Sequence, residues 1–358
     1  MHSHADRGNE RAKNMPGTTK VRRSYQSFTN MKDAQGLLFF KSSDRSATMK
    51  TWEQLIKGTL DANVRSLARL ISKIENRDEG WQDAMRRIYP HCGNAKVIGI
   101  TGSPGAGKST LTNAMTVCIQ KMNKSVGIIA VDPSSPFSGG AVLGDRLRMR
   151  DVGTLPGVYI RSMATRGMLG GLCQGARDVA RILDAFGKDI VLIETVGVGQ
   201  DEIEVVKTAD MVLVVCVPGQ GDGIQAIKAG VMEIADIYVV NKSDRPGADE
   251  VVVDIQGMLE LSAKKVPVLK TVAAEHKGIQ VLVDEILLLL NHQTSNDHFQ
   301  QEQIREELLS LTQQMVFQSI YAQWQANGFL KQAIDNILKG KTDPYTLVND
   351  YLKRIKYL

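Results

Sequence analysis

Residues 102–110 carry the strongest chemical signal in the chain, because they combine three glycines with a lysine and several hydroxyl groups. They match the pattern G-x-x-x-x-G-K-[ST] and read Gly102-Ser103-Pro104-Gly105-Ala106-Gly107-Lys108-Ser109-Thr110. Glycines let backbone N–H groups curl around a phosphate, and a following helix adds its N-terminal dipole. The Lys108 amine would reach the β- and γ-phosphates, and the Ser109 hydroxyl would bind Mg²⁺. The pattern predicts a nucleotide-binding loop rather than a glycine-rich turn without a ligand.

The tetrapeptide at 241–244, Asn-Lys-Ser-Asp, indicates which base the nucleotide carries. The Asp244 carboxylate can accept hydrogen bonds from guanine N1–H and the 2-amino group, a donor pair that adenine lacks. Asn241 can bond the base and neighbouring loops, and the Lys242 stem can lie along the ring face. Backbone N–H groups of Ala273, Ala274 and Glu275 could reach guanine O6. Together with the phosphate loop, these residues predict GTP and GDP as ligands.

Three carboxylates are candidates for Mg²⁺ binding beside Ser109. Glu194 ends the apolar run at 190–194. P-loop proteins carry a second acidic group at this position, which holds Mg²⁺ through water, although Glu194 could simply cap a helix. Asp132 and Asp145 flank a stretch rich in Gly, Ser and Pro, and turn-forming aspartates are the alternative interpretation. We expect Lys108, Glu194 and Asp132 to serve catalysis, and Ser109, Asp132, Asp145 and Glu194 to serve the metal.

Hydrolysis by the chain alone is expected to be slow. Many GTPases position the attacking water with a glutamine directly after the glycine that corresponds to Gly197. Here Val198 follows Gly197, and Gln200 comes two residues later still. We therefore expect a partner or a second subunit to complete the site.

Composition narrows the class of protein further. The chain has 358 residues, 43% of them hydrophobic and 23% charged, with a net charge of +5, which is typical of a globular protein. This mild charge does not indicate nucleic-acid binding, and no apolar run approaches the roughly 18 residues of a membrane span. The four scattered cysteines and the polar first residues favour a reducing cytoplasm. Cys118 and Cys216 lie in apolar surroundings and are predicted to be buried.

Short apolar runs alternate with helical patterns across the middle of the chain. Continuous Val, Ile and Leu runs are typical of parallel strands covered on both faces, with ligands at their carboxyl ends. The predicted fold class is α/β, a mainly parallel P-loop GTPase sheet flanked by helices, with N- and C-terminal helical extensions. The predicted strands are Val97–Thr101, Val126–Val131, Val158–Arg161, Ile190–Glu194, Val212–Val217, Ile237–Asn241 and Pro267–Thr271.

Four segments are predicted along the chain. Residues 1–48 are expected to be disordered or variable, 49–94 a helical extension, 95–291 the GTPase domain, and 292–358 a C-terminal helical arm. The extension should hold one amphipathic helix from Thr51 to Ile74, with Thr51 and Gln54 forming a capping box, and a second helix at 79–89.

The C-terminal arm should follow a polar linker at 291–298. It should contain a long helix through 304–324 and shorter helices at 330–338 and 344–355. The apolar positions of the long helix exceed what a lone tail helix can bury. We therefore expect this helix to form a dimer interface, with packing on its own GTPase domain as the alternative.

With these residues in view, the chain closely resembles the MeaB/ArgK/MMAA GTPases over about residues 51–358. The matching stretches are GSPGAGKST (102–110), VDPSSPFSGGAVLGDR (131–146), TRGMLGG (165–171), ETVGVGQDE (194–202), PGQGDGIQAIKAG (218–230) and NKSD (241–244). The resemblance implies a homodimer that is a GTPase chaperone for an adenosylcobalamin-dependent acyl-CoA mutase, such as methylmalonyl-CoA mutase. It also implies three segments that respond to nucleotide, 132–145, 194–200 and 220–228. In the last of these, Gln220, Asp222 and Lys228 would couple the nucleotide state to the partner.

Two other interpretations belong to different functional classes. One is a P-loop kinase that phosphorylates a transport protein or a small molecule, an older label for this family. The Asn-Lys-Ser-Asp motif argues against the ATP that such a kinase would use. The other is a binding module that needs nucleotide only to fold, which the intact Lys108, Ser109 and Glu194 argue against.

Overall fold

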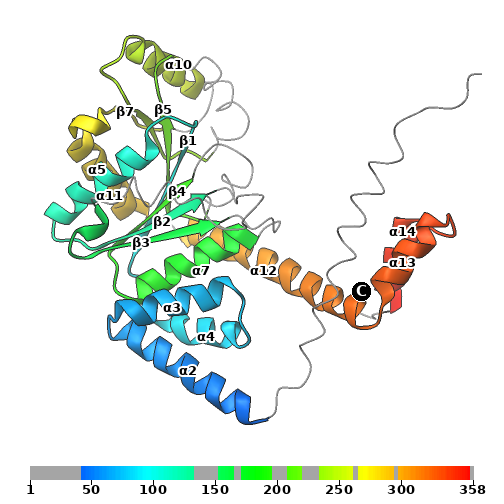
Figure 1. Cartoon of the computed structure of the whole chain (residues 1–358). Helices are drawn as coiled ribbons and strands as arrows, with labels where there is room; N and C mark the ends of the chain where they lie inside the picture. Colours follow the sequence, from blue (N-terminus) through cyan, green and yellow to red (C-terminus); the bar gives the residue numbers. More distant parts are fainter. Residues whose placement is uncertain are drawn as a thin grey trace, which may run out of the picture. The chain divides into compact units, whose positions relative to one another are not determined.

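The structure is a computed structural model that describes residues 42–132, 152–164, 171–195, 208–219, 234–260, 265–293 and 297–354 (Figure 1). The chain divides into two units between Glu53 and Gln54. The described part of the first unit is the beginning of helix α2 (Ser42–Leu60), and everything below concerns the second unit unless stated. The predicted domain boundaries stay predictions.

Seven parallel strands form one sheet in the order β3-β2-β4-β1-β5-β6-β7. All seven predicted strands are confirmed, with ends that differ by at most one residue, except that β3 continues three residues further. Strands β1, β4 and β5 lie at the centre, where Gly99 is paired with Ile193 on one side and Val212 on the other. The bounds are β1 Lys96–Gly102, β2 Val126–Asp132, β3 Val158–Ala164, β4 Ile190–Thr195, β5 Met211–Cys216, β6 Ile237–Val240 and β7 Val268–Lys270.

Alternate residues of the central strands enter two separate apolar clusters, as the period of two along a strand requires. Met211, Leu213 and Val215 of β5 belong to the cluster that contains α5 (Lys108–Lys121) and α11 (Ile279–Gln293). Val212, Val214 and Cys216 belong to the cluster on the other face, which contains α10 (Ala248–Glu260). The sheet is thus covered on both faces, as predicted for an α/β fold.

Helix α7 (Gly171–Ala185) covers strands β2 and β4 on the face opposite α5. Gly127 of β2 lies close to this helix, because a Cβ there would lie 2.9 Å from Leu183 Cδ1. Helices α3 (Val64–Glu75) and α4 (Trp81–Ile88) pack on α7 in turn (Figure 1). The short 3₁₀ helices are η1 Tyr89–His91, η2 Val152–Thr154 and η3 Ala273–Glu275.

The prediction of a single helix from Thr51 to Ile74 is wrong. Helix α2 begins at Ser42, so Thr51 lies inside it and forms no capping box, and residues 42–48 are helical rather than disordered. The helix ends at Leu60, and Ala62 takes a left-handed conformation with φ of 58°. Asn63 then caps α3, its Oδ1 accepting from the backbone N–H groups of Arg65 and Ser66, each at 3.0 Å. Residues 1–41 lie outside the described residues.

The C-terminal helices are α12 Asp297–Ala326, α13 Phe329–Leu338 and α14 Pro344–Arg354, which confirms three predicted helices. The predicted polar linker at 291–298 is wrong at both ends, because α11 continues to Gln293 and α12 begins at Asp297. Polar residues form helix ends here. Trp324, Phe329 and Tyr351 pack together, with ring centroids 4.9–5.3 Å apart.

Two further predictions can be compared with the structure. Cys118 and Cys216 are buried as predicted, and burial raises the pKa of the Cys216 thiol to about 12. Within the described ranges, no helix is both long and apolar enough to cross a bilayer.

Candidate functional site

The phosphate-binding loop joins the carboxyl end of β1 to the first turn of α5, and two of its glycines are required by close contacts. Gly102 has φ of 144°, and a Cβ there would lie 2.2 Å from the carbonyl oxygen of Val215. Gly107 has φ of 87°, and its Cβ would lie 2.6 Å from Asn241 Nδ2. Both positions need a backbone that side chains disfavour and space that a side chain would fill. The loop is therefore held in an open curve at the N-terminus of α5.

Lys108 is the first residue of α5, and its side chain folds back over the loop. Its Nζ donates to the carbonyl oxygens of Gly102 at 2.7 Å and Ser103 at 3.0 Å. The residue is buried, with 6% of its surface exposed. The amine thus lies within the curve of the loop, where the β- and γ-phosphates of a nucleotide would bind.

The structure brings together Ser109 and Glu194, two of the predicted metal ligands. The Ser109 hydroxyl donates to Glu194 Oε1 at 2.5 Å, and Glu194, on the central strand β4, is 7% exposed. Hydroxyl and carboxylate oxygens are ligands that Mg²⁺ prefers. These two residues fit a metal bound beside the nucleotide phosphates.

The structure does not describe the side chains of the other residues predicted to bind the metal or to couple to the partner. Asp132 ends β2 with its backbone paired to Ala164 of β3, but its side chain is outside the described part of the chain. The same is true of every atom of Asp145, Val198, Gln200, Gln220, Asp222 and Lys228. Among described residues, no three His, Cys, Asp or Glu side chains form a group that could hold a metal ion. The full Mg²⁺ set therefore stays a prediction.

Asn241 follows β6 and ties the phosphate loop to the loop after β7. Its Nδ2 donates to the carbonyl oxygen of Ala106 at 2.9 Å. Its Oδ1 accepts from the Thr271 hydroxyl and from the Ala273 N–H, both at 3.1 Å. Asn241 is 2% exposed, so this amide is a buried link between the phosphate end and the base end of the site.

Lys242 forms a second link to the phosphate loop. Its φ is 55°, and its Nζ donates to the carbonyl oxygen of Gly105 at 2.7 Å. The stem of Lys242 therefore spans the gap between the base motif and the loop, and its place along the ring face stays a prediction.

The base-facing end of the site is open. Asp244 and Ala274 are exposed, so both are accessible to a ligand. The predicted donor role of Ala273 and Glu275 is not supported, because their N–H groups bond Asn241 Oδ1 and the Val272 carbonyl oxygen. Ala274 is the candidate donor to guanine O6 that this leaves. Gly278, with φ of 74°, closes the loop where a Cβ would lie 2.4 Å from the Lys270 carbonyl oxygen.

Sequence reasoning missed one contact at the base of the site. The Thr195 hydroxyl at the end of β4 donates to Thr101 Oγ1 of β1 at 3.2 Å, and both residues are fully buried. The sequence could have indicated this contact, since each threonine lies at or next to the end of an apolar strand on the side of the phosphate loop. This bond joins the strand that carries Glu194 to the strand that leads into the loop.

The parallel sheet, the loop before α5 and the base motif after β6 together define a P-loop guanine-nucleotide-binding protein. Comparison with known proteins agrees with this class and also identifies the family. A family described as "Methylmalonyl Co-A mutase-associated GTPase MeaB" matches residues 67–328. The chain belongs to this family of GTPases.

Curated relatives support the assignment over most of the chain. A GTPase of Pyrococcus abyssi is 43% identical over 313 residues, covering 85% of this chain and 96% of the relative. "GTPase ArgK" of Escherichia coli is 33% identical over 296 residues, covering 78% and 89%. A Caenorhabditis briggsae protein called "Methylmalonic aciduria type A homolog, mitochondrial" is 36% identical, covering 54% of this chain and 51% of the relative.

A solved structure agrees with the fold. The protein titled "LAO/AO transport system kinase" has 25% sequence identity and a TM-score of 0.62, and the match covers 89% of this chain and 99% of that one.

Proposed function

We propose that this GTPase serves an adenosylcobalamin-dependent acyl-CoA mutase, such as methylmalonyl-CoA mutase. In this proposal, GTP binding and hydrolysis gate the loading of adenosylcobalamin and protect or rescue the mutase. The observation that carries it is the family match across residues 67–328, whose description names association with that mutase. The name of the Caenorhabditis briggsae relative, which refers to methylmalonic aciduria, supports the same partner.

Two side chains of the site would exchange partners when GTP binds. Lys108 now donates to loop carbonyl oxygens, and its amine would turn to the β- and γ-phosphates. Ser109 now donates to Glu194, and its hydroxyl would turn to Mg²⁺. Glu194 then loses one partner just before residues 196–200. Through this exchange, binding of the γ-phosphate would affect the residues that follow β4.

Mg²⁺ would neutralise charge that develops on the phosphates during hydrolysis. We propose that Ser109, Asp132, Asp145 and Glu194 hold it. Val198 stands where many GTPases have a water-positioning glutamine, so the chain alone would turn over slowly. A partner that orders the site would accelerate hydrolysis.

We also propose a cytoplasmic homodimer joined through the C-terminal arm. Exposed apolar side chains along α12 support this assembly, because large apolar groups in such numbers usually mark an interface. They include Leu308, Leu309, Met315, Val316 and Phe317, each about half or more exposed.

Cofactor transfer tests the proposal directly. Purified chain would be mixed with adenosylcobalamin and the apo form of methylmalonyl-CoA mutase, and cofactor uptake followed by visible absorbance. We expect uptake to differ between GTP and GDP, and the difference to vanish in Lys108→Ala, which loses its phosphate contact. The mutase assignment would be contradicted if cofactor uptake were the same with and without the chain and with either nucleotide, and if size-exclusion chromatography showed no complex of the chain with the mutase.

A further inference from the structure

Helix α7 carries three charged side chains, three residues apart, that bind three different elements. Asp178 Oδ2 accepts from Arg77 Nη1 at 2.6 Å, next to α4. Asp184 accepts from the backbone N–H groups of Gly93, Asn94 and Ala95, just before β1, at 2.5, 3.2 and 2.9 Å. Arg181, between them, binds Glu307 of α12. Residues three apart on a helix lie on one side of it, so α7 has one side devoted to polar contacts with its neighbours.

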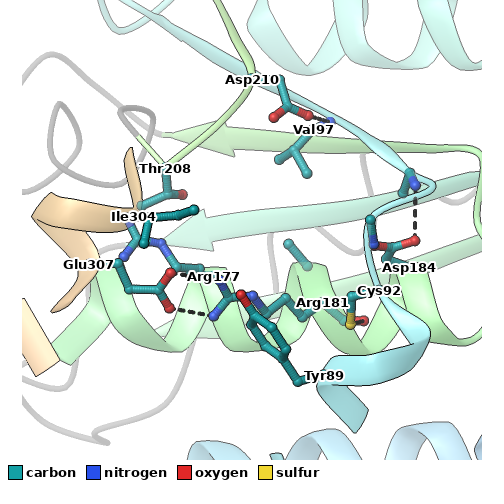
Figure 2. Close-up of a pocket in the computed structure, with 13 residues that line it drawn as sticks. Tyr89, Cys92, Val97, Arg177, Arg181, Asp184, Thr208, Asp210, Ile304 and Glu307 are labelled. Atoms are coloured by element: carbon teal, nitrogen blue, oxygen red, sulfur yellow. Dashed lines mark hydrogen bonds and ion pairs between the residues drawn. The ribbon is translucent and has the colours of Figure 1, made fainter. Parts of the chain in front are cut away.

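The Arg181–Glu307 contact is a two-pronged ion pair. Arg181 Nη2 donates to Glu307 Oε2 at 2.7 Å, and Nη1 donates to Oε1 (Figure 2). The guanidinium also lies over the Tyr89 ring, 4.9 Å from its centroid. The two side chains are only 22% and 12% exposed. Such bidentate, partly buried pairs fix orientation as well as distance.

The charge of Glu307 is retained over a wide pH range. Burial alone would raise its pKa, but hydrogen bonding to Arg181 and the charges of Arg181 and Arg177 lower the pKa below its ordinary value. The contribution of the pair is therefore present above the pH range where free glutamate titrates. It is lost only as pH falls through the lowered pKa.

Two hollows flank this ion pair. One cavity of about 270 Å³ lies on the side of Cys92, Asp210 and Ile304 (Figure 2). A second, of about 370 Å³, lies on the side of Trp81 and Met315. Tyr89, Arg181 and Glu307 line both. Because side chains that line a hollow have fewer packed neighbours, the ion pair is a specific contact that holds this part of α12 to α7.

Helix α7 also reaches the nucleotide end of the sheet. It begins at Gly171, after β3 has ended at the carboxyl edge, and it leads back toward the amino end of β4. Its 15 residues span about 22 Å as a rigid rod. A shift of its first turn would thus reach Arg181.

We propose that α7 transmits the nucleotide state of the site to α12, with Arg181 and Glu307 as the positioning residues. The inference requires GTP binding, but it requires neither the mutase nor the dimer. The C-terminal arm would then adopt one tilt with GTP and another with GDP.

Amide hydrogen exchange measured by mass spectrometry tests this in the full-length protein. Exchange would be compared with GDP and with the β,γ-imido analogue of GTP, in the unsubstituted chain, in Glu307→Gln and in Glu302→Gln. Glu302 is the matched control, because it pairs with Arg305 on the same helix at 3.3 Å but is 47% exposed. Exposed pairs of this kind contribute little.

In the unsubstituted chain, exchange across 304–315 should differ between the two nucleotides. Glu307→Gln should speed exchange at 89–95 and 304–315 by about tenfold and abolish that difference, since charged hydrogen bonds are lost. Glu302→Gln should match the unsubstituted chain. The proposal is wrong if the two variants behave alike, if the nucleotide difference survives in Glu307→Gln, or if the unsubstituted chain shows none. If exchange in β1 and β4 shows that Glu307→Gln unfolds, the same comparison would be made with Arg181→Lys. This variant keeps the positive charge but loses the two-pronged hydrogen bonding to Glu307. Light scattering on the same samples reports the dimer separately.

Discussion

Replacing Asn241 with alanine should destabilise the site more than the small size of the asparagine side chain suggests. The side chain makes three hydrogen bonds, to Ala106 O, Thr271 Oγ1 and Ala273 N. Both Thr271 and Ala273 are almost fully buried, with 1% and 3% of their surface exposed. Water cannot readily reach these buried groups, so they would be left without a hydrogen-bonding partner when the Asn241 amide is removed.

The expected loss follows from these three bonds. Each contributes about 1 kcal/mol net, which gives about 3 kcal/mol for the set. In a domain of about 200 residues, 1 kcal/mol corresponds to about 2–4 °C in Tm, so the variant should melt about 6–12 °C lower. GDP affinity should also fall about tenfold, because the loop at Ala106 loses its brace to the base loop.

Differential scanning calorimetry and isothermal titration with GDP measure both effects. Asn94→Ala is the matched control, because the Asn94 side chain is exposed and only its backbone N–H bonds Asp184. We expect the control to melt within about 1 °C of the unsubstituted protein, as surface substitutions usually do. A shift in Asn241→Ala as small as the control's, with unchanged GDP affinity, would refute the argument that Asn241 joins the two ends of the site.

Three further predictions concern the base, the assembly and the partner. Asp244→Asn should weaken GTP and favour xanthosine nucleotides, whose 2-oxo group matches an amide donor; equal GTP and ATP affinities of the unsubstituted chain by calorimetry would contradict this. A chain ended at Gln293, the last residue of α11, should be monomeric by light scattering, whereas a truncated chain that stays dimeric would disprove the arm as the interface. Lys228→Ala should keep basal GTP hydrolysis and lose acceleration by the mutase, and an unaltered acceleration would show that Lys228 does not couple to the partner.

The sheet and the phosphate loop could be predicted because their signals are local. An apolar run such as 190–194 must be buried wherever it lies, and the spacing from Gly102 to Lys108 describes one loop. The motif at 241–244 was similarly readable, including the contact of Asn241 with neighbouring loops. What the sequence did not reveal is that Asn241 uses Ala273 N–H, because that contact joins residues distant along the chain.

Errors arose where one local pattern fits two structures. The apolar repeat continues through residues 61–63, but Ala62 takes a left-handed conformation and Asn63 caps a new helix. Polar residues at 291–298 resemble a linker, yet polar residues also form exposed helix ends. No sequence motif singles out the charges at 178, 181 and 184, and only the fold shows that each meets a partner.

The most direct test of the central claim is GTP turnover by the purified chain, alone and with an adenosylcobalamin-dependent methylmalonyl-CoA mutase. We expect the rate of the chain alone to lie far below the roughly 10 per second of a median enzyme, because a valine side chain at position 198 cannot hydrogen-bond the attacking water. We expect a marked increase with the mutase, and no turnover in either condition for Lys108→Ala. Ordinary enzyme rates without a partner, or a slow rate that the mutase leaves unchanged, would contradict this claim.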